Sequence, residues 1–159
     1  RWKDYVAIGF ILAIFHNVVV YTVSATWLLS ISEEGIFRGC ILGQLSRKYS
    51  STTAILFSST LFGLYHIYYI PLIFSKQLVE VLFQASYAFH SFTAGLFLAY
   101  FYYKTDGNLL GPVVYHFSSI FFNVPLLWTK ATPMAQIIAH QLSSALNIVQ
   151  IVILKFTIR

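Results

Sequence analysis

Residues 5–32, YVAIGFILAIFHNVVVYTVSATWLLSIS, contain no Asp, Glu, Lys or Arg. A helix crosses a bilayer with about 20 predominantly apolar residues, so this run predicts a membrane-spanning helix. Four further uncharged runs are long enough to do the same, and a shorter charged stretch between the first two is also expected to be helical. The further runs are 49–75, 81–103, 107–129 and 131–154. The sequence therefore predicts an all-α fold, a polytopic membrane helix bundle of about six helices.

Short connections separate the expected helices, which we assign to a single membrane domain over residues 1–159. The clearest break is Lys104-Thr-Asp-Gly-Asn108. Asp106 or Asn108 can cap the helix that follows, and Pro112 fits its first turn. The six helices are expected at about 6–30, 33–48, 53–74, 78–103, 109–128 and 134–154.

Composition supports a membrane protein. Of the 159 residues, 58% are hydrophobic and 9% are charged, whereas a soluble domain has roughly 25% charged residues. This balance excludes intrinsic disorder and argues against a soluble globular domain. The net charge is +5, but the basic residues are scattered, so we expect contacts with the lipid bilayer and no nucleic-acid partner.

Cys40 is the single cysteine, so no internal disulfide can form. Arg1 opens the chain, so we expect a fragment or a processed product.

Basic residues also suggest an orientation. If all six helices cross, Lys76 and Lys130 lie on one side of the membrane. Seven basic residues lie on the other side: Arg1, Lys3, Arg47, Lys48, Lys104, Lys155 and Arg159. The positive-inside rule then predicts that both termini are cytoplasmic or on the equivalent side. We expect an integral, multi-pass protein, and the sequence leaves open which membrane holds it.

Ionisable residues at membrane depth cost about 2.5–3.5 kcal/mol each and so need an explanation. Glu34 and Arg38 are four residues apart on one helix face and can pair. Glu33 lies about 140° around the helix from Arg38 and needs another partner. His66 and His116, on two further helices, could form an acid–base constellation with Glu33. The alternatives are that both glutamates favour a helix N-terminus and that each histidine is a packing residue.

Several other polar residues in the apolar runs are expected to have packing or interfacial roles. They are His16, Asn17, Glu80, Gln84, His90 and His140. Among them, His16 and Asn17 are expected to bond to neighbouring helices, and His90 lies near Gly95 at an expected close helix contact. The sequence contains no HExxH, no Cys cluster and no Gly-rich phosphate loop. We therefore predict no metal and no cofactor.

Three motifs, in order, resemble those of the CPBP intramembrane proteases, the group that contains the type II CAAX prenyl endopeptidases and the bacterial Abi proteins. Glu33-Glu34-Gly-Ile-Phe-Arg38-Gly39 resembles the EExxxRG motif of this family. Phe62-Gly-Leu-Tyr-His66 resembles its second motif, FxxxH, and the run from Asp106 to His116 is similar to the approach to its third motif. The resemblance covers about residues 29–124.

The resemblance implies a glutamate-dependent endopeptidase inside the bilayer, acting on peptides or prenylated peptides. Glu33 would be the general base and would activate water together with His66. His116 would help to hold the oxyanion. Arg38 would brace the site by pairing with Glu34.

The third motif departs from the family pattern, which has Asn or Asp four residues after the histidine. Here that position is Ile120, which can neither donate to an oxyanion nor orient His116. Asn123 is seven residues after the histidine and about 10 Å further along the helix axis, so it cannot easily replace the missing donor.

Two hypotheses of function therefore stand. The first is a working or weakened endopeptidase. The second is a catalytically impaired family member, a pseudoenzyme that acts as a non-enzymatic subunit or scaffold with other membrane subunits. A catalytic pocket should gather Glu33, His66 and His116 around a wet cavity. In a relict, side chains such as Phe37, Tyr65 or Ile120 would fill that cavity.

Overall fold

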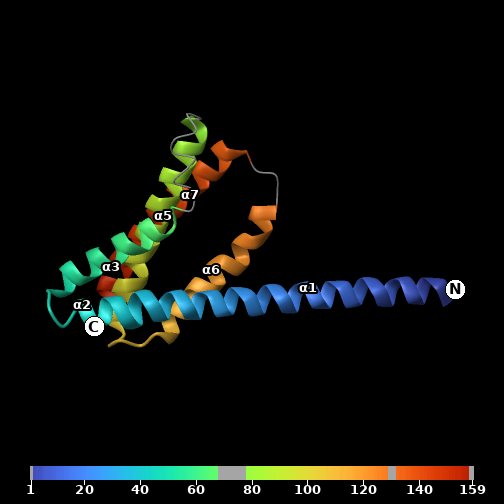
Figure 1. The fold of residues 1–159 in the computed structure, drawn as a ribbon, viewed down its shortest axis with the longest axis horizontal. Coiled ribbons are helices and arrows are strands. Elements are labelled where there is room, and N and C mark those ends of the chain that lie inside the picture. The colour runs from blue at the N-terminus through green and yellow to red at the C-terminus, as the bar shows by residue number, and fades with distance from the viewer. Residues whose placement is uncertain (1, 68–77, 129–131, 158–159) are drawn as a thin grey trace.

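The computed structural model describes residues 2–67, 78–128 and 132–157, and within them the chain is helical without a strand (Figure 1). This confirms the predicted all-α fold. The elements, in order, are α1 (Trp2–Glu34), a π-helical segment (Gly35–Leu42), α2 (Gly43–Leu45), α3 (Ser51–Tyr65), α5 (Leu78–Lys104), α6 (Leu110–Trp128) and α7 (Pro133–Thr157).

The first two expected helices, 6–30 and 33–48, are one continuous helix, so the predicted break between them is wrong. The π-helical segment carries the backbone from α1 into α2, and an uninterrupted apolar helix runs from Tyr5 to Leu45. The seven-to-two distribution of basic residues assumed that residues 33–48 cross the membrane as a separate helix, and the continuous helix removes that premise. The orientation itself stays a prediction. Lys76 and Lys130 lie outside the described residues.

The helices α5, α6 and α7 begin and end close to their expected limits. α3 ends at Tyr65, earlier than expected, and residues 68–74 of the expected helix lie outside the described part of the chain. The turn before α6 contains Asp106 at φ 51° and Gly107 at φ 81°. Asn108 Oδ1 accepts a hydrogen bond from Leu110 N at 2.9 Å, so Asn108 is the cap that the sequence suggested.

α3, α5 and α7 pack side by side, while α6 lies against the inner part of α1 (Figure 1). Glycine allows α3 and α5 to approach closely. A Cβ on Gly63 would lie 2.9 Å from Phe92 Cβ, and one on Gly95 would lie 3.2 Å from Ser59 Cα. The outer part of α1 projects from this bundle towards the N-terminus (Figure 1). The helix crossings place the ends of α1 and α3 beside α6, where the candidate site lies.

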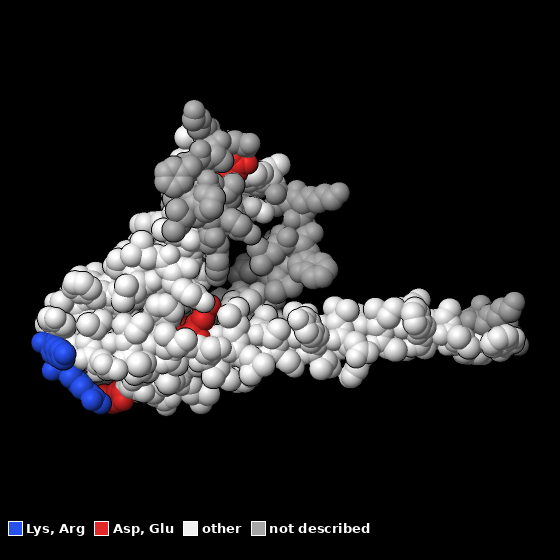
Figure 2. Space-filling model, viewed as in Figure 1, with Lys and Arg blue, Asp and Glu red and all other residues white. Residues whose placement is uncertain are grey.

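The outer surface is mostly apolar, and the visible face carries few charged side chains (Figure 2). Among the described residues, two helices are long and apolar enough to cross a membrane, Tyr5–Leu45 and Pro133–Thr157. His16 is exposed on the first of them. Asn17 Nδ2 donates to Ala13 O of its own helix at 2.7 Å, so the expected bond from Asn17 to a neighbouring helix is wrong.

Candidate functional site

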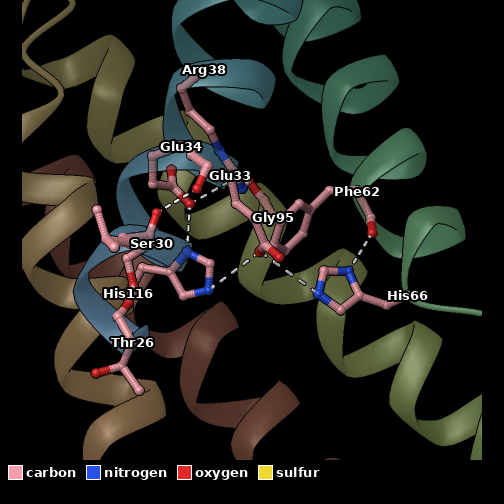
Figure 3. Close-up of polar contacts among 11 residues, drawn as sticks. Thr26, Ser30, Glu33, Glu34, Arg38, Phe62, His66, Gly95 and His116 are labelled. Atoms are coloured by element: carbon pink, nitrogen blue, oxygen red, sulfur yellow. Dashed lines mark hydrogen bonds and ion pairs between the residues drawn. The ribbon is translucent and has the colours of Figure 1, made fainter. Parts of the chain in front are cut away.

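A polar face on the inner part of α1 leads to the site (Figure 3). Thr26 and Ser30 follow one another at helical spacing, and Ser30 Oγ donates to Thr26 O at 2.8 Å. Both side chains are buried, as are Glu33 and Glu34 at the end of α1. Because α6 packs against this part of α1, the two carboxylates lie inside the protein despite their position in an apolar helix.

Glu34 is fully buried and binds two cationic or polar partners through one oxygen. Arg38 Nη1 donates to Glu34 Oε1 at 3.1 Å, and His116 Nδ1 lies 2.8 Å from the same atom. The predicted contact between Glu34 and Arg38 is thereby confirmed. Arg38 also donates from Nη2 to Gly95 O at 3.2 Å and places its guanidinium 4.4 Å from the centre of the Phe62 ring. These contacts tie α1, α5 and α6 together at one point.

Glu33 faces the two histidines. Its Oε2 lies 3.9 Å from His66 Nε2 and 3.7 Å from His116 Nε2 (Figure 3). Both separations exceed the usual range of a direct hydrogen bond. His66 caps the C-terminal end of α3, and its Nδ1 donates to Phe62 O at 2.7 Å. A neutral His66 with this proton on Nδ1 therefore presents the lone pair of Nε2 towards Glu33.

The structure brings together the five residues that the sequence singled out, Glu33, Glu34, Arg38, His66 and His116. The bond from Glu34 to His116 was not foreseen, because the two residues are 82 positions apart and no spacing connects them. Gly95 O was also missed as a partner of Arg38, since a backbone carbonyl has no side-chain signature.

Ile120 is half-buried on α6, one turn after His116. The side chain of Asn123 lies outside the described part of the structure. With His116 Nδ1 bonded to Glu34, the orientation of the ring does not depend on a polar residue at position 120. Without Asn or Asp at position 120, the site has one possible hydrogen-bond donor fewer. The imidazole of His116 is still held by Glu34.

Aromatic rings stand beside the site. Phe37 packs edge to face on Phe62 with ring centres 4.9 Å apart, and Tyr65 lies 5.5 Å from Phe37 and 5.4 Å from His66. Phe37 is buried, whereas Tyr65 is exposed. The site thus combines ionisable groups with a largely apolar surrounding, in which charged interactions are strengthened.

Chemically, the arrangement offers a carboxylate, an imidazole acceptor and a second imidazole held by a carboxylate. Within the described residues, no group of three or more His, Cys, Asp or Glu side chains is spaced to hold a metal ion. The other histidines of the bundle lie elsewhere: His140 Nδ1 is 3.1 Å from Ser86 Oγ, and its ring stacks on His90.

Comparison with known proteins identifies the family. The model of the type II CAAX prenyl endopeptidase Rce1-like family matches residues 14–122, a range that contains all five site residues. No curated protein and no solved structure matches the chain. The family match covers more than half of the sequence, and the members of this family are membrane-embedded endopeptidases. The chain therefore belongs to the Rce1-like family of type II CAAX prenyl endopeptidases.

Proposed function

We propose that this chain is a multi-pass intramembrane endopeptidase in which Glu33 and His66 activate a water molecule. The observation that carries the proposal is the position of Glu33 Oε2, 3.9 Å from His66 Nε2 and 3.7 Å from His116 Nε2 in a buried site. Polar atoms separated by more than a hydrogen bond inside a protein are often bridged by water. A water molecule beside Glu33 and His66 would donate one hydrogen to each.

The first step follows from this arrangement. The water oxygen attacks the carbonyl carbon of the scissile peptide bond, the carbonyl electrons move to its oxygen, and Glu33 takes the proton. When the tetrahedral intermediate collapses, the carbon–nitrogen bond breaks and Glu33 delivers the proton to the leaving nitrogen. His66 holds the attacking water through Nε2, since its Nδ1 proton is engaged by Phe62 O.

His116 has the role of oxyanion partner. Its Nδ1 lies 2.8 Å from Glu34 Oε1, so a ring that carries a proton on each nitrogen directs Nε2–H into the site. Glu34 is in turn compensated by Arg38. A single donor aimed at a developing oxyanion is typically worth about 10²–10³ in rate. Arg38 does not touch substrate in this scheme and acts as a positioning residue.

The substrate class is a peptide that reaches the site from the membrane, with a prenylated peptide as the specific candidate. The apolar surface of the bundle and the aromatic rings beside His66 support an approach by an apolar substrate.

A second candidate is a non-catalytic subunit of a larger membrane assembly. It is favoured by Ile120, which supplies no donor, and by Phe37, which packs closely beside Phe62 and Tyr65. In this case the ionic cluster would be retained only because removing one partner of a buried pair is costly.

A peptidase assay separates the two candidates. The purified protein in lipid nanodiscs is mixed with a library of peptides, with and without a prenylated cysteine, beside the variants Glu33→Gln and Glu80→Gln. We expect turnover in the parent protein and in Glu80→Gln, and none in Glu33→Gln, because glutamine cannot take a proton from water. A chelator should leave turnover unchanged.

The contrary results are equally specific. A well-folded parent protein that cleaves no peptide favours the non-catalytic subunit. Turnover that a chelator abolishes and zinc restores would overturn the scheme in which Glu33 and His66 act on water without a metal.

A further inference from the structure

A second set of buried and half-buried polar side chains lies between α5 and α7. We call it the polar seam. It consists of the buried Ser86, Thr93, Ser144 and Asn147 with the half-buried His90 and His140. Asn147 Nδ2 donates to Thr93 Oγ1 at 3.3 Å, and the rings of His90 and His140 stack with centres 5.6 Å apart. A bundle held together by apolar packing alone does not need so many polar groups at one helix contact.

Some polar atoms in and beside the polar seam have no hydrogen-bond partner within the described part of the chain. Ser86 Oγ donates its proton to Phe83 O at 2.8 Å, so the contact of 3.1 Å with His140 must use the proton on His140 Nδ1. A neutral His140 then has only an acceptor left, at Nε2. In addition, His90 Nδ1 is buried and has no hydrogen-bond partner among the described residues. The same holds for Gln84 Oε1, which lies outside the polar seam on the face of α5 that packs on α3.

Buried acceptors of this kind are usually satisfied by ordered water, because an unpaired polar atom inside a protein costs about 1–3 kcal/mol. Internal water molecules typically bond to two to four such groups. Here polar atoms of His90 and His140 without a further partner in the described chain lie at the contact between α5 and α7, and Gln84 Oε1 lies on the neighbouring face of α5. Such a set of polar atoms can bind a file of water molecules.

Tyr87 connects the polar seam with the candidate active site. Its ring centre lies 5.2 Å from that of His140 and 5.7 Å from that of His66. His66 is the residue that would hold the attacking water. The reaction consumes one water molecule for each bond cleaved, and the rings of Phe62 and Tyr65 pack against His66 on other sides.

We infer that the polar seam is hydrated and that water reaches the Glu33–His66 pair along it, past Tyr87. This rests on the proposed function for its purpose, but the hydration itself does not. Gln84 and His90 are positioning residues in this scheme, since they bind the water file and touch no substrate.

Radiolytic labelling of the parent protein in nanodiscs tests the hydration without any assay of activity. Hydroxyl radicals generated from bound water oxidise the side chains next to that water. Tyr87 is half-buried, whereas Tyr21 is 77% exposed on the apolar surface of α1 and would face lipid. We expect Tyr87 to be oxidised faster than Tyr21. Oxidation of Tyr87 at the rate of Tyr21, or more slowly, would overturn the inference.

Variants test the supply of water. Gln84→Leu and His90→Phe should each slow the labelling of Tyr87 and lower turnover by about tenfold with KM unchanged, while His90→Gln should retain most of the turnover. The matched controls are Gln141→Leu and His16→Phe, at exposed positions, and they should leave both readouts unchanged. Unchanged turnover in Gln84→Leu and His90→Phe would overturn the supply route.

If the parent protein cleaves nothing, the proposed function fails separately, and the labelling still decides whether the polar seam is hydrated.

Discussion

His116 and Arg38 share one atom, Oε1 of Glu34, at 2.8 Å and 3.1 Å. The carboxylate therefore holds the imidazole in place and also compensates a guanidinium that is fully buried. Arg38 depends on this arrangement, because its Nε has no partner among the described residues and its other contacts are one carbonyl and one aromatic face. At the scale of single residues, the site is a charge balance between Glu34 and Arg38, with Glu33 beside it.

The charge balance predicts the effect of changing Arg38. Arg38→Ala leaves Glu34 buried without its cation, which can cost about 3–5 kcal/mol of stability. Arg38→Lys keeps a positive charge and should cost less, although it loses the planar fork. Thermal unfolding of the purified variants measures the difference, with Arg47→Ala as an exposed control. Equal melting of Arg38→Ala and the parent protein would refute the assignment.

Ile120→Asn tests the altered third motif. Since Glu34 already orients His116, the gain from asparagine should come only from a new donor near the oxyanion. We expect turnover to rise by about tenfold, or about 1.4 kcal/mol, while Ile120→Val should change it little. Peptide cleavage by the two variants under the same conditions is the measurement. If Ile120→Asn cleaves no faster than Ile120→Val, a side-chain donor at position 120 does not reach the oxyanion.

How far the site could be predicted depends on the distance along the chain. The pair Glu34 and Arg38 could be predicted from its spacing of four residues, because helix geometry fixes which side chains are neighbours. The contact between Glu34 and His116 could not, because it depends on how α6 crosses α1. The motif resemblance selected five residues that the structure brings together, but it did not indicate that Nδ1 of His116 would bond to Glu34.

At the scale of elements, the π-helical segment Gly35–Leu42 explains why two expected helices are one. Charges at positions 33, 34 and 38 suggested an end to the membrane helix. In the structure these charges are buried against other helices, so the helix continues through them. Ser58 Oγ of α3 donates to Phe37 O of the π-helical segment at 2.9 Å. Such a contact depends on packing, and local sequence patterns do not reveal it. π-helical turns are often found at functional sites.

The contact between α3 and α5 depends on glycine. In Gly63→Ala, the new Cβ would lie 2.9 Å from Phe92 Cβ and 3.0 Å from Ala88 O, so the helices must separate. We expect a loss of about 1–3 kcal/mol, the usual cost of overpacking. Gly9→Ala is the matched control, since nothing lies within 4 Å of that position and alanine favours a helix. Thermal unfolding that is the same for both variants would contradict this account of the contact.

At the scale of the whole molecule, the apolar surface and the length of α1 set the relation to the membrane. The continuous helix from Tyr5 to Leu45 has 41 residues and is therefore about 60 Å long. The hydrocarbon core is about 30 Å thick, so the whole helix cannot lie within it along the membrane normal. Exposed apolar side chains dominate the outer part of α1, which supports contact of that part with lipid.

A charge on this surface should interfere with insertion. Val18 is 52% exposed in the middle of the uncharged run. Val18→Asp should cost about 2.5–3.5 kcal/mol at membrane depth, and Val18→Ala should cost far less. The fraction of chains that resist alkaline extraction from membranes measures the effect. Equal membrane integration of the two variants would show that the outer part of α1 does not lie in lipid.

The most direct test of water activation by Glu33 is a single turnover in water labelled with ¹⁸O. If Glu33 acts as a general base, the first product molecule carries one ¹⁸O atom in its new carboxylate, and Glu33 itself remains unlabelled. If Glu33 instead attacks the peptide bond directly and water then opens the resulting anhydride at the Glu33 carbonyl, the first product carries an oxygen from Glu33 and the ¹⁸O is found in the side chain of Glu33. Mass spectrometry of the product and of the peptide that contains Glu33 distinguishes these results, and the second would contradict the proposed mechanism.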